Sequence, residues 1–331
     1  MRVPLSVLDL APVPSGSTQA EALRRTVDLA RLADRLGYVR LWYAEHHSMP
    51  SIASSVPELL IAHAAAATER IRVGSGGIML GNHVPLRVAE TFRTLAALHP
   101  GRIDLGIGRA PGTDPRTRRA LRAFDPQAFG GQVEELAAYA SGGFSEGHPF
   151  HGVQAVPSDV TLPPIWLLGS SGASATYAGA HGMGYAFASH FSPAPAAPAL
   201  EAYRGAFVPS EAFPEPHAIL AVAALCAETA ERAEHLAATL DLVWLRLQRG
   251  ELRPLPTPEE ALAHPYTPAD REALAERRAL VIVGPPQQVR EQIEARASEA
   301  GADEVMVTTL VHDHGDRLRS YELLMGEAVH A

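Results

Sequence analysis

The sequence contains no lysine, so all 28 of its basic residues are arginine. Without a lysine amine the chain cannot form a Schiff base with a carbonyl substrate, anchor pyridoxal phosphate or build the lysine-bearing phosphate loop of NTPases. Its single cysteine, Cys226, cannot form a disulfide within the chain. Because Cys226 ends an apolar run over residues 221–226, we expect a small buried hydrophobe there and no catalytic role.

Long apolar stretches and basic runs are missing as well. No segment approaches the roughly 20 apolar residues that a membrane-spanning helix requires, and the first residues lack the apolar core and cleavage site of a signal peptide. The formal net charge is -9, and no run of basic residues is long enough to follow a phosphate backbone. We therefore expect a cytoplasmic protein that binds neither a membrane nor a nucleic acid.

Short apolar runs rich in valine, isoleucine and leucine alternate with longer helical patterns, which indicates βα units around a parallel sheet. Eight such runs occur, at residues 3–8, 38–42, 71–74, 103–107, 165–168, 184–188, 218–226 and 304–310. Eight strands with intervening helices favour a closed (β/α)8 barrel over an open doubly wound sheet, and such barrels commonly exceed the usual domain size. We expect the α/β class, with residues 1–331 forming one TIM-barrel domain.

Two stretches interrupt the alternation of strands and helices. Residues 111–131 follow the fourth run and are rich in arginine, aspartate and proline, while residues 249–268 carry five prolines. Barrels commonly grow insertions in their βα loops, where they form lids or substrate walls. The two stretches are either such lids or plain surface excursions.

Polar or glycine-rich segments follow several of the expected strands. In a (β/α)8 barrel the active site is built at the carboxyl ends of the strands, so residues just after each strand are the strongest candidates. These segments are Glu45-His46-His47, Gly74-Ser75-Gly76-Gly77, Gly106-Ile107-Gly108-Arg109, Gly169-Ser170-Ser171-Gly172 and His190.

The adjacent histidines His46 and His47 offer groups that change protonation near neutral pH and therefore suit proton transfer. Neighbouring side chains of an extended chain point in opposite directions, so we expect one of the two to be structural. Metal binding is an alternative, but no nearby residue completes a ligand set, and we predict no metal site. We interpret His312 and His314, further along the chain, as solvated loop histidines.

Two glycines stand where the chain leaves the third strand. Gly76 and Gly77 carry no side chain, which lets a flat ring lie directly on the backbone. An ordinary tight turn has the same pattern, so the sequence alone leaves a cofactor platform and a turn as alternatives.

A possible phosphate site follows the fifth strand. Ser170, Ser171 and Gly172 precede a helical pattern, and the free N–H groups of a helix start, together with two hydroxyls, can bind a phosphate. An ordinary N-cap has the same sequence. Arg109 could supply a fixed positive charge to this phosphate, and a solvated or paired surface arginine is the alternative.

Taken in order along the chain, five segments resemble the bacterial luciferase-like flavin monooxygenases, in particular a single-chain group that is similar to an alkanal monooxygenase subunit. The segments are LSVLD at 5–9, WYAEHH at 42–47, IRVGSGGIML at 71–80, PGRIDLGIGR at 100–109 and IWLLGSS at 165–171. The likeness continues through 281–285 and 303–321, so it covers nearly the whole chain. It implies a luciferase-like barrel with insertions in its βα loops.

The resemblance also implies roles for individual residues. His46 stands at the position of the family's catalytic histidine, with Glu45 and His47 beside it. Gly76-Gly77 matches the place where the family has a non-prolyl cis peptide beneath the isoalloxazine ring of FMN. The residues that fall where the family holds the FMN phosphate are Arg109, Ser170, Ser171 and Gly172.

The reaction implied by the resemblance is the oxidation of a small organic substrate by O2 with reduced FMN, while His46 moves a proton. Reduced FMN would come from a separate flavin reductase, because no second nucleotide-binding motif is visible. The resemblance also implies a homodimer. One position departs from the family pattern, since luciferase itself has a glutamate where Ser170 stands.

Two other functions fit the same sequence. An F420-dependent dehydrogenase shares the barrel and transfers hydride without O2, and a flavin-binding protein without turnover would share the cofactor site. The presence of His46 and Arg109 argues against the second of these. The identity of the substrate depends on loop side chains that the sequence does not assign to positions.

Overall fold

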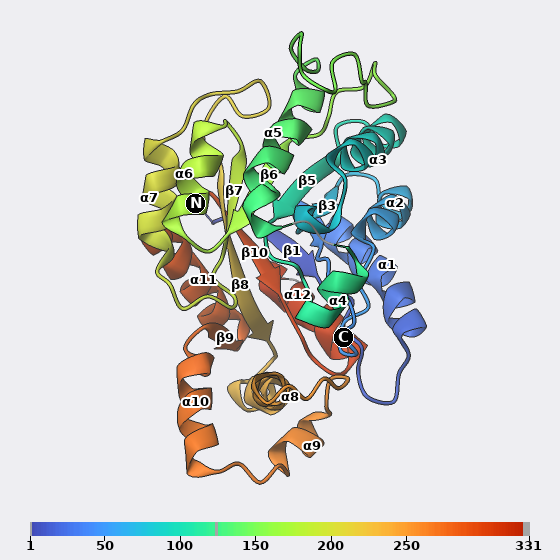
Figure 1. Cartoon of the computed structure of the whole chain (residues 1–331). Helices are drawn as coiled ribbons and strands as arrows, with labels where there is room; N and C mark the ends of the chain where they lie inside the picture. Colours follow the sequence, from blue (N-terminus) through green and yellow to red (C-terminus); the bar gives the residue numbers. More distant parts are fainter. Residues whose placement is uncertain (1, 123–124, 327–331) are drawn as a thin grey trace.

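Eight parallel strands close into a barrel in the computed structural model, which describes residues 2–122 and 125–326 (Figure 1). Neighbouring strands follow the order β10-β1-β2-β3-β5-β6-β7-β8, and β8 returns to pair with β10. The strands are β1 (Leu5–Asp9), β2 (Arg40–Tyr43), β3 (Arg72–Ser75), β5 (Ile103–Gly108), β6 (Ile165–Gly169), β7 (Gly184–Ala188), β8 (Ala218–Cys226) and β10 (Glu304–Thr308). The predicted (β/α)8 barrel is confirmed.

Two further strands were not among the eight predicted runs. The two-residue strand β4 (Ile78–Met79) pairs with β5. The other, β9 (Val281–Gly284), pairs with β8. Residues 219–223 of β8 pair with β10 and residues 223–226 pair with β9. The long strand β8 therefore belongs to the barrel in its first part and carries β9 outside the ring in its second.

Helices surround the strands and are bounded by local signals in the sequence. The first, α1 (Gln19–Leu36), begins after Thr18, whose side chain accepts a hydrogen bond from the backbone N–H of Glu21, and ends at Gly37. Figure 1 shows α1 to α3 on one side of the barrel and α6, α7 and α11 on the other. These helices are α2 (Pro57–Ala67), α3 (Pro85–Leu98), α6 (Gly172–Ala180), α7 (Ala196–Gly205) and α11 (Pro286–Ala300), with α5 (Phe129–Ala140), α8 (Ala230–Gln248) and α12 (His314–Met325) elsewhere around the ring.

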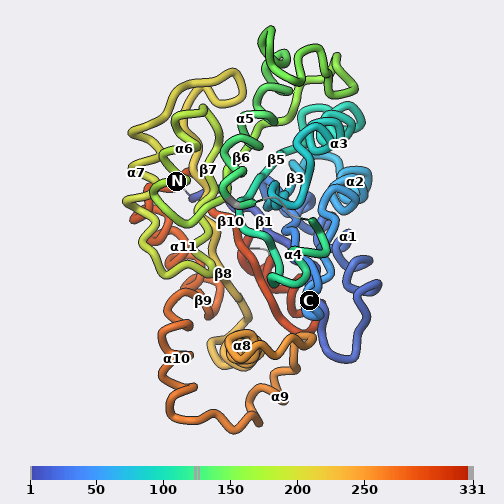
Figure 2. Tube along the Cα trace, in the orientation of Figure 1, coloured from blue at the N-terminus to red at the C-terminus, as the bar shows by residue number. Residues whose placement is uncertain are grey.

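Both predicted insertions contain short helices. Within residues 111–131 lie α4 (Pro115–Ala120), the 3-10 turn η2 (Pro126–Ala128) and the start of α5, while positions 123–124 lie outside the described residues. The second insertion contains α9 (Pro258–Leu262) and leads into α10 (Pro268–Arg278). The arrowhead of β8 points toward α8, with α9 and α10 beyond it (Figure 1), and the trace in Figure 2 shows the segment between α5 and β6 projecting at the opposite end.

Backbone contacts attach each insertion to a loop at the carboxyl end of the strands. The N–H of His47, after β2, donates to the carbonyl of Gly112 at 3.0 Å. In the second insertion, Leu255 exchanges hydrogen bonds with the loop after β1, through Val13 at 2.9 Å and Ser15 at 2.8 Å. Both insertions therefore lie at the mouth of the barrel, where an active site is expected.

The barrel interior is filled by alternate residues of the strands, as the period of two requires. Its middle is apolar and includes the edge-to-face pair Trp42 and Trp166, with ring centroids 5.5 Å apart. A second, larger apolar core lies between the strands and the surrounding helices. Cys226 is buried, and burial raises the pKa of its thiol to about 12, which confirms its prediction as a small hydrophobe.

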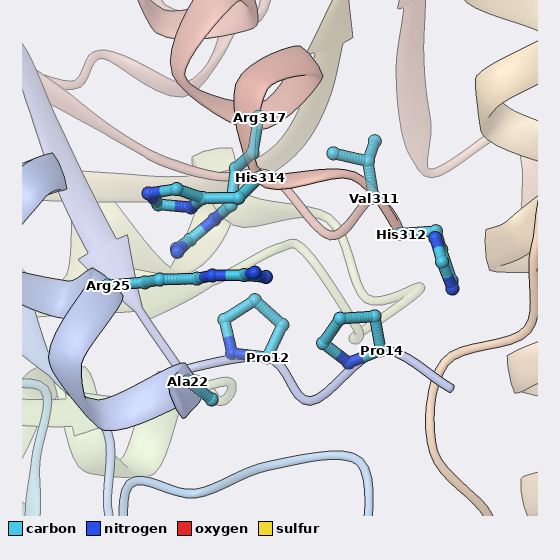
Figure 3. Close-up of a pocket in the computed structure, with 8 residues that line it drawn as sticks. All are labelled: Pro12, Pro14, Ala22, Arg25, Val311, His312, His314 and Arg317. Atoms are coloured by element: carbon cyan, nitrogen blue, oxygen red, sulfur yellow. The ribbon is translucent and has the colours of Figure 1, made fainter. Parts of the chain in front are cut away.

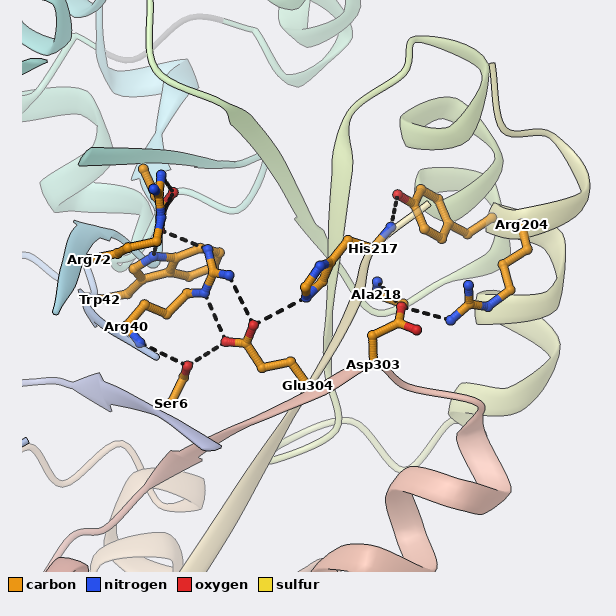
Figure 4. Close-up of polar contacts among 11 residues, drawn as sticks. Ser6, Arg40, Trp42, Arg72, Arg204, His217, Ala218, Asp303 and Glu304 are labelled. Carbon is orange, nitrogen blue, oxygen red and sulfur yellow. Dashed lines mark hydrogen bonds and ion pairs between the residues drawn. The ribbon is translucent and has the colours of Figure 1, made fainter. Parts of the chain in front are cut away.

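A buried network of charges closes the barrel at the amino ends of the strands (Figure 4). The Arg40 guanidinium donates to both carboxylate oxygens of Glu304, at 2.8 and 2.9 Å, and to Asp104 at 2.9 Å. Arg72 also pairs with Asp104, at 2.6 Å. Ser6 and His217 hydrogen-bond to Glu304 as well. Every carboxylate here is buried and paired, so this network is a structural plug rather than an open site.

No helix among the residues that the structure describes is long and apolar enough to cross a membrane.

Candidate active site at the barrel mouth

The predicted site residues leave neighbouring strands at the same edge of the barrel. Trp42 of β2 is in register with Gly74 of β3, so His46 and the pair Gly76-Gly77 follow adjacent strands. Ile107 of β5 is in register with Leu167 of β6, so Arg109 and Ser170 also follow adjacent strands. The sequence-predicted residues therefore line one continuous arc of the mouth, from β2 to β6.

His46 has a fixed backbone and an unused ring nitrogen. The backbone N–H of His46 donates to the carbonyl of Ser54 at 2.9 Å. The imidazole is half-buried, and its Nδ1 is buried without a hydrogen-bond partner among the described residues. Burial lowers the pKa of His46, with the charge of Glu45 opposing that effect. At neutral pH the ring is therefore neutral and able to accept a proton.

Glu45 is fully buried and receives hydrogen bonds from four groups. The donors are the ring of His47 at 2.9 Å, the ring of His83 at 2.9 Å, the side-chain amide of Asn82 at 2.9 Å and the backbone N–H of Met79 at 2.8 Å. Burial opposes ionisation, but the hydrogen bonds from His47 and His83 outweigh it and lower the pKa of Glu45 to about 2.

The structure separates the predicted trio into two parts. Glu45 and His47, two residues apart, are hydrogen-bonded to one another, whereas His46 lies between them in the sequence and makes no such bond. His83 and Asn82 complete the Glu45 cluster and were not predicted, because they come from a loop that no spacing in the sequence connects to Glu45. Within the described residues no group of three or more histidine, cysteine or acidic side chains is arranged to hold a metal ion.

Gly76 and Gly77 are joined by a cis peptide bond, as the resemblance implied. Both residues are closely packed, Gly76 against side chains and Gly77 against the backbone of β5. A Cβ atom on Gly76 would lie 2.7 Å from a methyl carbon of Leu8, and one on Gly77 would lie 2.8 Å from the carbonyl oxygen of Gly106. Packing therefore requires glycine at position 77, whatever lies above the bond, while a side chain at position 76 would displace Leu8.

The predicted phosphate residues occupy the start of α6 and the end of β5. Ser171 is the N-cap of α6, and its hydroxyl accepts from the N–H of Ser174 at 3.5 Å, so the ordinary N-cap is confirmed for this residue. The Arg109 side chain is exposed and makes no ion pair or hydrogen bond with the described residues. A phosphate role for Arg109, Ser170, Ser171 and Gly172 remains a prediction.

The histidines at 312 and 314 line a small crevice between the β1 loop, α1 and α12 (Figure 3). The ring of His312 contacts the hydroxyl of Ser15 at 3.1 Å, and the ring of His314 lies 3.4 Å from a carboxylate oxygen of Asp28. Both rings are half-buried. The interpretation of His312 and His314 as solvated loop histidines is therefore wrong, because the loop after β10 folds back onto the start of the chain.

Residues 3–304 match the family model of the luciferase-like monooxygenases. The chain belongs to this family. A luciferase-like monooxygenase of Escherichia coli K12 is 41% identical over 326 residues, covering 98% of this chain and 96% of the relative. YvbT of Bacillus subtilis is 46% identical over 322 residues, covering 97% and 95%. The crystal structure of apo-MsnO8, 42% identical, superposes with a TM-score of 0.89 over 98% of this chain and 97% of that one.

Three further similar proteins have names that state a reaction or a cofactor. An N-acetyl-S-alkylcysteine monooxygenase of Bacillus subtilis is 33% identical over 97% of this chain and 96% of its own length. A Baeyer-Villiger monooxygenase of Pseudomonas putida in complex with FMN has a TM-score of 0.73 at 20% identity. An F420-dependent secondary alcohol dehydrogenase has a TM-score of 0.65 at 14% identity. At 20% and 14% identity the likeness shows the fold alone, and these two structures show that the fold can carry FMN or F420.

Proposed function

We propose that this luciferase-like protein is an FMN-dependent monooxygenase that oxidises a small organic substrate with O2, with His46 as its acid–base residue. The observation that carries the proposal is the unpartnered Nδ1 of His46 at the barrel mouth, one strand away from the cis bond between Gly76 and Gly77. Membership of the monooxygenase family and the named monooxygenase among its relatives support the reaction class.

The arc of residues from β3 to β6 suits a flavin mononucleotide. Gly76 and Gly77 offer a surface without side chains for a flat ring. The exposed guanidinium of Arg109 and the free N–H groups at the start of α6 suit a terminal phosphate. Reduced FMN, when bound, would supply the electrons for the reaction with O2.

The protein contributes to the chemistry an acid–base group, the ring of His46 with its unpartnered Nδ1. Because burial keeps the pKa of this ring below its usual range, the imidazole is neutral at neutral pH and accepts a proton from the reacting group, then returns it. The Glu45 cluster would hold the loop that carries His46, since its carboxylate ties that loop to the backbone of Met79. The insertions at 111–131 and 249–268 would exclude water from the mouth. We further propose a homodimer supplied with reduced FMN by a separate reductase.

Replacing Arg109 with alanine is expected to weaken the binding of FMN. The guanidinium has no partner among the described residues, so its charge is available to a phosphate, and a charge-assisted hydrogen bond contributes about 1.5–3 kcal/mol. That loss corresponds to a Kd about 10- to 160-fold larger. Fluorescence titration of the purified variant with FMN measures the change.

Two controls make the Arg109 experiment specific. Arg87→Ala removes an exposed arginine from α3 that pairs with Glu90, and we expect it to leave the Kd for FMN unchanged. Titration of the wild-type protein with FAD tests the preference for a terminal monophosphate, and FAD should bind more weakly. An unchanged Kd in Arg109→Ala removes this residue from the phosphate site, and FAD binding as tight as FMN removes the monophosphate assignment altogether.

A further inference from the structure

Besides His46, two side chains at the barrel mouth have buried nitrogens without a hydrogen-bond partner among the described residues. They are Nδ1 of His190, which follows β7, and Nη1 of Arg277, in the last turn of α10. Buried polar nitrogens normally have a hydrogen-bond partner. Two of them without a partner at the same end of the barrel indicate that a ligand completes the site. The proposed function uses neither residue.

His190 stands across the mouth from His46. In the closed ring β7 lies four strands away from β2, which is the opposite side of an eight-stranded barrel. Ala188 of β7 is in register with Ala221, an inward-facing residue of β8, so His190 leaves its strand beside β8, and the buried Nδ1 shows that its ring turns toward the protein rather than toward solvent. The space between His190 and His46 is therefore the central part of the mouth.

The pairing of β7, β8 and β9 brings Arg277 to the same side of the mouth as His190. Ala188 of β7 is in register with Ala221 of β8, and Ala223 of β8 is in register with Val281 of β9. His190, two residues after β7, and Arg277, four residues before β9, therefore flank the same part of β8. The pKa of His190 agrees with this placement, since burial is the largest cause that lowers it to about 4 and the charge of Arg277 contributes to the same shift.

The charge of Arg277 is not neutralised by the described part of the protein. No acidic side chain there lies within ion-pair distance of Arg277, whereas its sequence neighbour Arg278 pairs with Asp241 at 2.7 Å and with Glu234 at 3.3 Å. Burial lowers the pKa of Arg277, which is the sign of an unfavourable environment for its charge. A partly buried cation without a counter-charge is costly unless an anion completes the site.

We propose that Arg277 and His190 bind a carboxylate group of the organic substrate and hold the reacting end of that substrate toward His46. Arginine suits this role because its planar guanidinium matches the two oxygens of a carboxylate. The flavin phosphate is a poorer occupant, since its proposed ligands follow β5 and β6 while Arg277 lies just before β9, beside β8 and the loop after β7. The assignment of the carboxylate to a substrate rests on the proposed function.

Hexanoate and hexanamide test the proposal, because they share a chain length and differ in charge. In calorimetric titrations of flavin-free protein, hexanoate should bind about tenfold more tightly than hexanamide. Arg277→Gln should lose that difference, Arg277→Lys should keep part of it, and His190→Gln should weaken hexanoate to a smaller degree. Arg271→Gln, an exposed arginine on the same helix, and Arg109→Ala should both leave hexanoate binding unchanged.

Several results would overturn the proposal. Equal binding of hexanoate and hexanamide shows that the site does not select an anion. Unchanged hexanoate binding in both Arg277→Gln and His190→Gln places the anion elsewhere. A loss of FMN affinity in Arg277→Gln that equals its loss of hexanoate affinity assigns Arg277 to the flavin. Because the carboxylate titrations contain no flavin, their outcome is independent of whether FMN proves to be the cofactor.

Discussion

Replacing His46 with alanine is expected to lower turnover by a factor on the order of 10²–10⁴, the usual contribution of general acid–base catalysis. The ring is half-buried and its Nδ1 bonds to no described residue, so the substitution removes a proton carrier with little loss of packing. Folding and FMN binding should therefore persist. Turnover is measured at steady state, with reduced FMN supplied by a separate reductase, on a substrate that the wild-type protein oxidises.

His47→Ala is the matched control for His46→Ala. The ring of His47 is hydrogen-bonded to the buried Glu45, where His83 and Asn82 also donate, so its loss removes one of several donors and leaves His46 in place. We expect a smaller decrease in turnover for His47→Ala. A His46→Ala variant with normal turnover would show that the ring is not the acid–base residue, and one that fails to fold would show that the ring is structural.

Replacing Arg40 with leucine is expected to lower the free energy of unfolding by about 3–5 kcal/mol, because it leaves two buried carboxylates without their shared cation. Arg40 pairs with Glu304 at 2.8 Å and with Asp104 at 2.9 Å, and both carboxylates are almost completely buried. Denaturation with urea measures the change. The matched control is Arg204→Leu, which removes an arginine paired with the half-exposed Asp303 beside the same network (Figure 4).

The Arg204 variant should lose at most about 1 kcal/mol, since exposed ion pairs contribute little. A similar small loss in Arg40→Leu would contradict the role of the buried network. The two variants should also differ with pH. Burial would raise the pKa of Glu304, but His217 and Arg40 hold it at about 2, below its ordinary value of 4.5.

The pH dependence of stability provides a second readout for Arg40. Since the pKa of Glu304 is lowered by folding, the stabilisation it provides is present above about pH 4.5 and is lost as pH falls toward about 2. Without Arg40 the pKa of Glu304 rises, so the variant should gain little stability between pH 3 and pH 6. The free energies of unfolding of the wild-type protein and of Arg40→Leu, measured between pH 3 and pH 6, test the sign of the effect.

The sequence predicted the barrel because its strands are short, apolar and separated by helices with clear start and stop residues. It did not predict β9, although residues 280–283 stand out as an apolar run, because β9 joins the sheet only through the second half of the unusually long β8. Strand length, which decides this pairing, is set by tertiary contacts rather than by local composition. The two-residue β4 is too short to leave a periodic signal.

The positions of the candidate residues were predictable where they directly follow strands, as for His46, whereas the cis bond between Gly76 and Gly77 was expected only from the family resemblance. The contacts that support the site were not predictable, because Glu45 meets His83 across 38 residues of sequence and only the folded loop joins them. The plug at the other end did leave a signal. Arg40 and Glu304 are charged residues at the starts of apolar strands, where alternation can direct a side chain into the barrel.

Anaerobic titration of the purified protein with reduced FMN and with reduced F420 tests the central claim most directly, because the luciferase-like fold carries both cofactors. We predict saturable binding of reduced FMN at one site per chain, with a Kd about tenfold or more below that for F420. Tighter binding of F420, or no binding of reduced FMN, would contradict the assignment of this protein as an FMN-dependent monooxygenase.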